Sequence, residues 1–371
     1  MTKLILPLLL ILCVPLMGAD VKRTAKQLAA IKARAEQGNA KDQQYLGFAY
    51  REGLGVPKDL KKSFEWFSRS ADQGYAGGQR GLAWAYYKGL GNVKNHKKSV
   101  ELWTKSAKQG DSQSQYYLAL MYYNGQGIKQ DFKEALKWYQ KAAEQGFVKA
   151  QFELGRMHDY GQGVKQDDAK AMVCYTKAAK AGNANAQFYL GRSYIFGHGV
   201  QKDLMEAMKW VRKAADQGLD NAQSILGEAY GNGQGVEKDI KEALKWFQKA
   251  AEQENATAQN NLGMIYLIGQ GVEQDFKEAL KWFQKAADQG HAKAQFGLGI
   301  AYGKGQGLPR DLLKAYTWIE ISSVNGAPTG QVRIELFGLK AAGMKSSQIT
   351  KAEALAKEMI AKNPQLIKKK E

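Results

Sequence analysis

Histidine and cysteine are the residues of this chain best suited to bind a metal ion or to attack a substrate. The sequence has only 4 histidines and 2 cysteines in 371 residues. The histidines lie far apart in sequence, at His96, His158, His198 and His291. No His-Glu-x-x-His motif, closely spaced cysteine pair or recognisable Ser–His–Asp order occurs, as a zinc site or a nucleophilic triad would require. The sequence therefore predicts a non-enzymatic protein with no catalytic residue, no metal site and no cofactor.

A second motif with chemical potential is Gly-x-Gly, which first appears at Gly53 and Gly55. Such a pair can cradle phosphate, but a phosphate loop also needs a preceding strand and a following Lys-Ser/Thr. Neither is present, and the pair recurs at one spacing along the chain, as far as Gly305 and Gly307. The motif is typical of a turn after a helix, where glycine adopts the left-handed conformation without steric cost.

These glycine pairs belong to a 36-residue unit that occurs eight times without insertion or deletion. Its skeleton is Gln-x-x-Leu-Gly-x-x-Tyr-x-x-Gly-x-Gly, followed by Asp, a Lys-rich stretch and a closing Ala-Ala-x-x-Gly. The leucine marks the register, at Leu46, Leu82, Leu118, Leu154, Leu190, Leu226, Leu262 and Leu298. A fixed period of this length indicates stacked helix pairs that bury their apolar faces against one another. We expect a long surface and no enclosed catalytic pocket.

Each unit is predicted to contain two helices, called helix A and helix B below. Helix A of the first unit spans about residues 41–51 and ends at the Gly-x-Gly turn. Helix B begins at an N-capping side chain, namely Asp59, Asn95, Asp131, Asp167, Asp203, Asp239, Asp275 and Asp311. In four units a glutamate three residues later predicts a capping box, at Glu134, Glu206, Glu242 and Glu278. Helix B ends at glycine except at Glu254, where we expect Asn255 to adopt the left-handed conformation instead.

Recurrence at helical spacing predicts the core. Helix A contributes Leu46, Gly47, Tyr50 and their copies, and helix B contributes a small residue, a tryptophan and an Ala-Ala pair. The tryptophans are Trp66, Trp138, Trp210, Trp246, Trp282 and Trp318. We interpret this row as core, and a ligand-stacking ladder is the alternative. Cys174 takes the tryptophan position of the fourth unit and is predicted to be a small buried residue, with a reactive thiol as the alternative. The glutamine of every unit, first at Gln43, is predicted to bridge adjacent units through loop backbone.

The two ends of the chain differ from the repeats. Residues 1–19 combine Lys3, an apolar run and a small-residue pair at Gly18, which predicts a secretory signal peptide. The run is shorter than the roughly 20 residues of a membrane span, so we expect no transmembrane segment after cleavage. We divide the rest into an N-terminal capping helix (20–38), the repeats (39–326), and a C-terminal capping helix with a basic tail (327–371). The repeats are 39–74, 75–110, 111–146, 147–182, 183–218, 219–254, 255–290 and 291–326. The last helix is predicted to begin at a Ser cap and to span about residues 347–362.

The formal net charge is +18 at pH 7. In a cytosolic protein this excess would favour nucleic acid as the partner. In an exported protein it favours an anionic polymer of the cell envelope or an acidic partner, and we expect no nucleic acid. A solvated face of lysines, such as Lys133, Lys137 and Lys141, is the simpler explanation of much of the excess.

The Leu-Gly-x-x-Tyr block, the doubled glycine, the Asp and the Ala-Ala-x-x-Gly close resemble the Sel-like repeat family, which is related to tetratricopeptide repeats. The match covers all eight units, for example Leu262 to Gly290. The resemblance implies an all-α fold: a right-handed superhelical α-solenoid that scaffolds protein complexes. Exported bacterial members are linked to envelope regulation or to host-cell interaction. Some cysteine-rich relatives have been proposed to bind or hydrolyse β-lactams, but this chain lacks their cysteines, Ser-x-x-Lys and Lys-Thr-Gly.

If recurring residues are structural, recognition should use the positions that vary between copies. Those on helix A are two and five residues after the leucine, and in related solenoids helix A lines the concave groove. Trp, Tyr and Arg dominate binding hot spots, so we predict a partner-binding zone of Trp84, Tyr87, Tyr123, Arg156 and Arg192. Packing between adjacent A helices is the alternative role for the variable apolar residues.

The leading functional hypothesis is a scaffold or adaptor in the bacterial periplasm or outside the cell, which binds a protein or peptide. The second hypothesis is a protein that binds envelope polysaccharide or peptidoglycan. A β-lactamase-like hydrolase is the least supported. A eukaryotic secretory lumen, where relatives act in protein quality control, is an alternative location.

Overall fold

The computed structural model describes residues 25–367, apart from a few side chains between residues 329 and 341. Within this range the chain forms nineteen α-helices and one 3-10 turn, and it contains no strand. The predicted signal peptide and the basic tail Lys368–Lys370 lie outside the described residues. The prediction of an all-α solenoid with eight repeats is confirmed.

The helices alternate as predicted, with a 12- or 13-residue helix in each position of the repeats. The A helices are α2 (Ala40–Glu52), α4 (Ala76–Lys88), α6 (Ser112–Asn124), α8 (Val148–Asp159), α10 (Ala184–Phe196), α12 (Asp220–Asn232), α14 (Ala256–Ile268) and α16 (Ala292–Lys304). The B helices are α3 (Leu60–Asp72), α5 (His96–Lys108), α7 (Phe132–Glu144), α9 (Asp168–Lys180), α11 (Leu204–Asp216), α13 (Ile240–Glu252), α15 (Phe276–Asp288) and α17 (Leu312–Val324).

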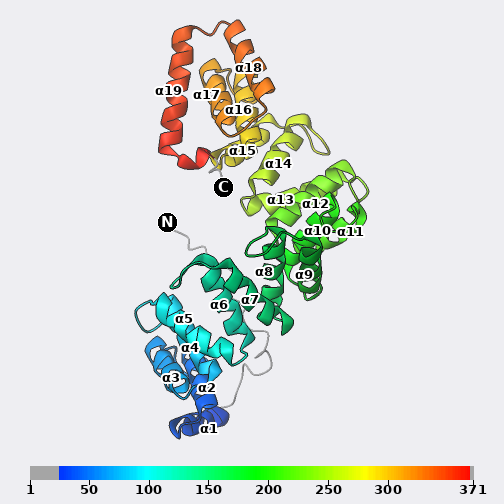
Figure 1. Ribbon diagram of the computed structural model, residues 1–371. Helices are drawn as coiled ribbons and strands as arrows, with labels where there is room; N and C mark the ends of the chain where they lie inside the picture. The colour runs from blue at the N-terminus through cyan, green and yellow to red at the C-terminus, as the bar shows by residue number, and fades with distance from the viewer. Residues whose placement is uncertain (1–24, 368–371) are drawn as a thin grey trace. The chain divides into compact units, whose positions relative to one another are not determined.

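The chain divides into two compact units, residues 1–178 and 179–371, with the division inside α9. Within the first unit, helices α1 (Ala25–Glu36) to α8 each pack against the next along the chain (Figure 1). Within the second unit the same holds from α10 to α17. Each repeat therefore buries its apolar face against its sequence neighbours, as in other repeat proteins.

The turn between helices A and B has one geometry throughout. Both glycines of the first pair are left-handed, with φ of 77° at Gly53 and 71° at Gly55. The Asp59 carboxylate accepts a hydrogen bond of 3.0 Å from the Lys62 N–H, which caps α3. The Asp59 N–H in turn donates to the carbonyl oxygen of Tyr50 at 2.9 Å. The cap thus ties the start of helix B to the end of helix A.

This tie explains why the predicted capping boxes are wrong. A capping box needs the N–H of the capping residue as a donor to the glutamate. The Asp131 N–H already donates to the Tyr122 carbonyl at 3.0 Å. Glu134 instead forms an ion pair with Lys137 at 3.1 Å. The equivalent glutamates also pair with the lysine three residues later, in Glu206–Lys209, Glu242–Lys245 and Glu278–Lys281.

The position of Glu254 corrects a second expectation. Glu254 has φ of 65° and is the one non-glycine residue with positive φ among residues 25–367. Asn255 does not take the left-handed conformation, because it caps α14 with φ of −66° and accepts from the Ala258 N–H at 2.9 Å. Glutamate therefore occupies a backbone conformation that glycine holds in the other repeats.

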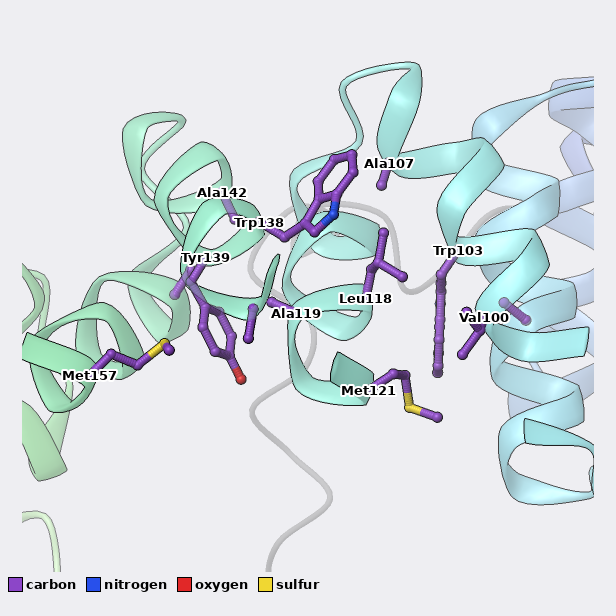
Figure 2. Packing of buried hydrophobic residues seen from close by; sticks show 13 residues of the cluster. Val100, Trp103, Ala107, Leu118, Ala119, Met121, Trp138, Tyr139, Ala142 and Met157 are labelled. Atoms are coloured by element: carbon purple, nitrogen blue, oxygen red, sulfur yellow. The ribbon is translucent and has the colours of Figure 1, made fainter. Parts of the chain in front are cut away.

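Helix B buries a further side chain in every repeat, at the residue after the tryptophan row, and this position was not predicted. No side chain of this row is more than 4% exposed, and it comprises Phe67, Trp103, Tyr139, Tyr175, Val211, Phe247, Phe283 and Ile319. A Cβ atom on Gly47 would lie only 2.6 Å from the Phe67 ring, so the recurring glycine of helix A lets the two helices approach. Figure 2 shows Trp103, Leu118 and Tyr139 filling the space between successive helices.

The tryptophan row is core in only some repeats, which corrects the prediction. Trp138, Trp246 and Trp318 are buried, whereas Trp66, Trp210 and Trp282 are half-buried. Most rings carry a basic side chain from the next helical turn, as when Lys285 Nζ lies 4.3 Å from the Trp282 ring centroid. The Tyr50 row, Leu154 and Cys174 are likewise half-buried rather than buried.

The recurring glutamine joins neighbouring helices through two amide bonds. The Gln115 Nε2 donates to the Ala107 carbonyl at 3.2 Å, and its Oε1 accepts from Gln145 Nε2 at 2.7 Å. The predicted bridge therefore exists, but its backbone partner lies in the preceding helix B rather than in a loop. Gln151 Oε1 is buried without a hydrogen bond among the described residues, and the fourth repeat has Ala181 where this second glutamine recurs.

The terminal helices cover the ends of the repeats. Ile31 and Ala35 of α1 are buried against the first repeat. At the other end, α18 (Thr329–Ala341) and α19 (Ser346–Lys362) follow α17, and the cap of α19 is Lys345 rather than the predicted serine. The chain continues into η1 (Pro364–Leu366), whose Leu366 carbonyl accepts from Gln295 Nε2 at 2.8 Å.

Candidate interaction surface

The predicted partner-binding residues lie on the A helices of both units. Trp84 and Tyr87 are near the end of α4, Tyr123 is near the end of α6 and Arg156 is on α8, all in the first unit. Arg192 is on α10 in the second unit. All five side chains are half-buried, so each makes contacts within the protein and also reaches solvent.

Trp84 and Tyr87 pack against the third repeat. The Trp84 ring centroid lies 5.1 Å from that of Tyr117 on the next A helix. The Tyr87 ring lies 5.5 Å from Trp103, and its hydroxyl group donates to Gln126 Oε1 at 3.4 Å. Contacts between repeats thus cover part of each ring, and the rest of the ring is accessible to solvent.

Tyr123 repeats this arrangement one unit further along. Its hydroxyl group donates to Gln162 Oε1 at 2.8 Å, and its ring lies 5.2 Å from Phe132. Tyr87 and Tyr123 therefore have the same anchor, a glutamine between the two glycines of the following turn. Aromatic side chains held in this way lose little conformational entropy when a partner binds.

Lys88 belongs to the same surface but was not predicted. Its Nζ atom lies 5.2 Å from the ring centroids of both Trp84 and Tyr87, and its side chain is exposed. A cation at this distance interacts favourably with the faces of both rings. The spacing of four residues from Trp84 on a helix was the available sequence signal.

Arg156 is held by an acidic neighbour. Its Nη1 atom lies 3.2 Å from Glu153 Oε2, and 34% of the Arg156 side chain is exposed. Burial raises the pKa of the Glu153 carboxyl group, and the charge of Arg156 opposes this shift. The guanidinium carbon also lies 5.9 Å from the ring of Tyr160, which is 53% exposed. Arg156 is therefore positioned by the protein before any partner arrives.

Arg192 has a different environment. Its guanidinium carbon lies 6.0 Å from the Phe188 ring centroid and 5.5 Å from that of Tyr189. These rings come from the preceding turn of α10, so the contact is local to one helix. The contacts of Arg192 thus lie entirely within the second unit.

Titratable groups elsewhere have shifted proton affinities without forming a cluster of ligands. Burial lowers the pKa of His158 and raises the pKa of the Cys174 thiol. Among residues 25–367, no group of three or more His, Cys, Asp or Glu side chains could hold a metal ion. A hollow of about 560 Å³ lies beside the third turn and is lined by Tyr122, Phe132, Lys133 and Gly163, among others.

The described helices are also too short or too polar to cross a membrane. In the first unit, the residues of the candidate surface are aromatic and basic, and they lie on helices that each pack against the next along the chain. Such a surface can bind another molecule through ring faces, hydrogen bonds and positive charge.

Comparison with known proteins identifies the repeat. The model of the Sel1 repeat matches residues 40–75, 76–111, 112–147, 148–183, 184–219, 220–255, 256–291 and 292–323. No curated protein matches the chain at a significant level.

Two solved structures are similar over most of the chain. One is a protective antigen present in uropathogenic Escherichia coli strains that displays an SLR fold; it is 32% identical with a TM-score of 0.63, over 92% of this chain and 81% of that one. Another is a Sel1 repeat protein from Oxalobacter formigenes, 32% identical with a TM-score of 0.62, over 87% of this chain and 98% of that one. Together with the eight family matches, these likenesses show that the chain belongs to the Sel1 repeat family.

Proposed function

We propose that this protein is a non-enzymatic scaffold of the bacterial cell envelope or secreted space that binds a protein or peptide partner along its A helices. The observation that carries the proposal is the set of half-exposed aromatic rings Trp84, Tyr87 and Tyr123, each fixed by contacts to its neighbours. Trp and Tyr are enriched at binding hot spots, and rings that are already ordered cost little entropy to bury. Lys88, above two of the rings, adds a positive charge to this surface.

The proposed location rests on the chain's first residues and on one relative. Residues 1–19 have the charged start, apolar middle and small-residue end of a signal peptide. The similar Escherichia coli protein is a protective antigen present in uropathogenic strains. Both observations support export.

A second candidate function is binding of an anionic envelope polymer, which the net charge of +18 favours. The two functions differ in their dependence on salt. Binding of a polymer through dispersed lysines should weaken steeply as the ionic strength rises, whereas a peptide held on aromatic rings should tolerate salt.

The proposal can be tested with partners captured from an envelope fraction and identified by mass spectrometry. The affinity of the purified partner is then measured by calorimetry for the Trp84→Ala and Lys88→Glu variants. Because Lys88 is exposed, its replacement should leave folding intact even if Trp84→Ala does not. Phe196→Ala is the matched control, since Phe196 is 60% exposed at the end of an A helix in the second unit.

We expect each of the first two variants to weaken binding by about tenfold or more, the equivalent of about 1.4 kcal/mol, and the control to bind normally. Unchanged affinity for a folded Lys88→Glu variant together with a folded Trp84→Ala variant would remove the proposed surface. Affinity that collapses in salt for all variants alike would favour the polymer-binding function.

A further inference from the structure

The turn of the second repeat, residues 88–98, departs from the pattern of the other seven turns. The residue after its second glycine is Asn92, where the other turns have an aliphatic residue: Val56, Ile128, Val164, Val200, Val236, Val272 and Leu308. The Oδ1 and Nδ2 atoms of Asn92 are both buried, and neither forms a hydrogen bond within the described chain. The next residue, Val93, is 85% exposed, where the other turns have Pro, Lys, Gln or Glu. In this turn, therefore, the polar residue Asn92 has the buried side-chain atoms and the apolar residue Val93 is the exposed one.

The same turn lacks the acidic cap of the others. Asn95 caps α5, whereas each of the other seven B helices begins after an aspartate. In the first repeat the lysine three residues after the cap pairs with that aspartate, with 3.7 Å between Lys62 Nζ and Asp59 Oδ2. Lys98 occupies the equivalent place beside a neutral cap, and its Nζ lies 5.2 Å from the Tyr86 ring centroid.

The result is a concentrated positive charge. Residues 88–98 contain four lysines and no acidic residue, namely Lys88, Lys94, Lys97 and Lys98, and all four side chains are exposed. The equivalent residues of the first turn, 52–62, contain three lysines and two acidic residues. Those of the third turn, 124–134, contain two of each. The net charge of the second turn is therefore three units more positive than that of the first turn and four units more positive than that of the third.

These three turns lie side by side. A Cβ atom on Gly91 would come within 2.7 Å of the Leu60 carbonyl carbon, which belongs to the first repeat. A Cβ atom on Gly127 of the third repeat would come within 2.5 Å of the His96 carbonyl carbon. The basic turn is thus flanked on both sides by turns that carry carboxylates.

The departures act against the stability of the turn itself. Buried amide atoms without partners destabilise a fold, and lysines in the first turn of a helix oppose its dipole. The aspartate before each of the other B helices offsets this effect, whereas α5 begins at the neutral cap Asn95. Positions where a sequence breaks the rules that its other segments follow are expected at functional sites.

We propose that residues 88–98, together with Trp84 and Tyr87, bind an acidic segment of a protein partner. This inference rests on the proposed protein-binding function and specifies the chemistry of the partner. The carboxylates of the segment pair with Lys94, Lys97 and Lys98, and an apolar side chain packs on Val93. The aromatic surface is continuous with the turn, because the Tyr87 ring lies 5.1 Å from the ring of His96.

The distribution of charge favours a short acidic segment over a membrane or a long polyanion. An extended anionic surface would meet the neighbouring turns as well, where Asp59, Asp131 and Glu134 would oppose it. A segment with a few carboxylates and one apolar residue can occupy the second turn alone. A site that bound its partner through charge alone would also have no use for the exposed apolar side chain of Val93.

The test uses the full-length protein and a fluorescent, glutamate-rich peptide with one central leucine. Binding is measured by anisotropy between about 50 and 300 mM salt, and phosphatidylglycerol vesicles serve as the competing probe. The principal variant is Lys94→Gln/Lys97→Gln/Lys98→Gln, and Asn95→Asp supplies Lys98 with the carboxylate that other turns have. The matched control is Lys129→Gln/Lys133→Gln in the third turn. Circular dichroism verifies that each variant is folded.

We expect the peptide to bind the wild type with an affinity that falls with salt, and to bind the triple variant about tenfold more weakly. Asn95→Asp should weaken binding severalfold without loss of helix, and the control variant should match the wild type. No peptide binding by the wild type, equal binding by the triple variant, or stronger capture by the vesicles would each overturn the inference. A partner whose affinity depends on Trp84 and Lys88 but not on Lys94, Lys97 and Lys98 would leave the proposed function standing and refute this inference alone.

Discussion

Glu254 offers a test of how the repeat stores local strain. Its φ of 65° lies in the left-handed region, where the equivalent Gly218 and Gly290 have φ of 91° and 78°. A side chain in this conformation costs about 1–2 kcal/mol. Glycine loses about 0.4–1 kcal/mol more backbone entropy on folding, which offsets part of the gain. Glu254→Gly should therefore stabilise the protein by about 0.5–1 kcal/mol.

Nothing else in the turn should change on this substitution. The Glu254 side chain is exposed, and its N–H donates to the Ala251 carbonyl at 3.1 Å. The Gly290 N–H makes the same bond, to the Ala287 carbonyl at 2.9 Å. No heavy atom lies within 4 Å of a Cβ built on the equivalent Gly218, so the cost at this kind of site is conformational rather than steric.

Urea denaturation and thermal melting provide the measurement, with an expected rise in the melting temperature of about 1–3 °C. Repeat arrays can unfold in parts, so hydrogen exchange of the α13 and α14 amides should be followed as well. Gly218→Glu, at an exposed glycine with the same left-handed conformation, is the reciprocal control and should lose a similar free energy. A lower melting temperature for Glu254→Gly, or no effect of Gly218→Glu, would refute the strain argument.

Two further predictions concern single residues. Asn92→Val should raise the free energy of unfolding by about 1–3 kcal/mol, because it removes a buried amide without partners from a position that is aliphatic in the other repeats. Urea denaturation measures this free energy, and a destabilised variant would contradict the prediction. The Cys174 thiol should react with iodoacetamide at least about tenfold more slowly in the native protein than in urea. Burial raises the pKa of this thiol and keeps it protonated at neutral pH. Equal rates in the native protein and in urea would show an accessible, reactive thiol.

The fold could be predicted from the sequence because each local signal occurs in many copies. The glycine pairs, the capping residues at Asp59 and its equivalents, and the leucine row each determine a turn, a helix start or a buried stripe. Eight repetitions remove the ambiguity that any one signal carries. By contrast, α18 has no copy elsewhere in the chain, and no helix was predicted there.

The predictions of the buried position of helix B and of the capping boxes were wrong because a tertiary contact selects between arrangements that the local sequence allows. Trp66 and Phe67 are adjacent on α3, and both face the apolar side of the helix. The close approach of Gly47 and Gly81 to the Phe67 ring selects Phe67 as the deeper of the two. The capping boxes failed for a similar reason, since the Asp131 N–H had a partner in the preceding helix.

The candidate surface was predictable in part. Variation between copies located Trp84, Tyr87 and Tyr123, and their contacts to Tyr117 and to the glutamines of the following turns required the structure. The unusual composition of residues 88–98 is visible in the sequence once the repeats are aligned. The burial of the Asn92 amide and the exposure of Val93 are not, because they depend on how the turns stack.

The central claim is that the residues shared by the repeats build the scaffold and that the residues that differ bind the partner. Hydrogen–deuterium exchange of the protein with and without its captured partner tests this claim most directly. We expect new protection at the ends of α4 and α6 and in residues 88–98, with α3 and α5 unchanged beyond their first turns. Protection concentrated instead on the tryptophan and lysine rows of the B helices would contradict it.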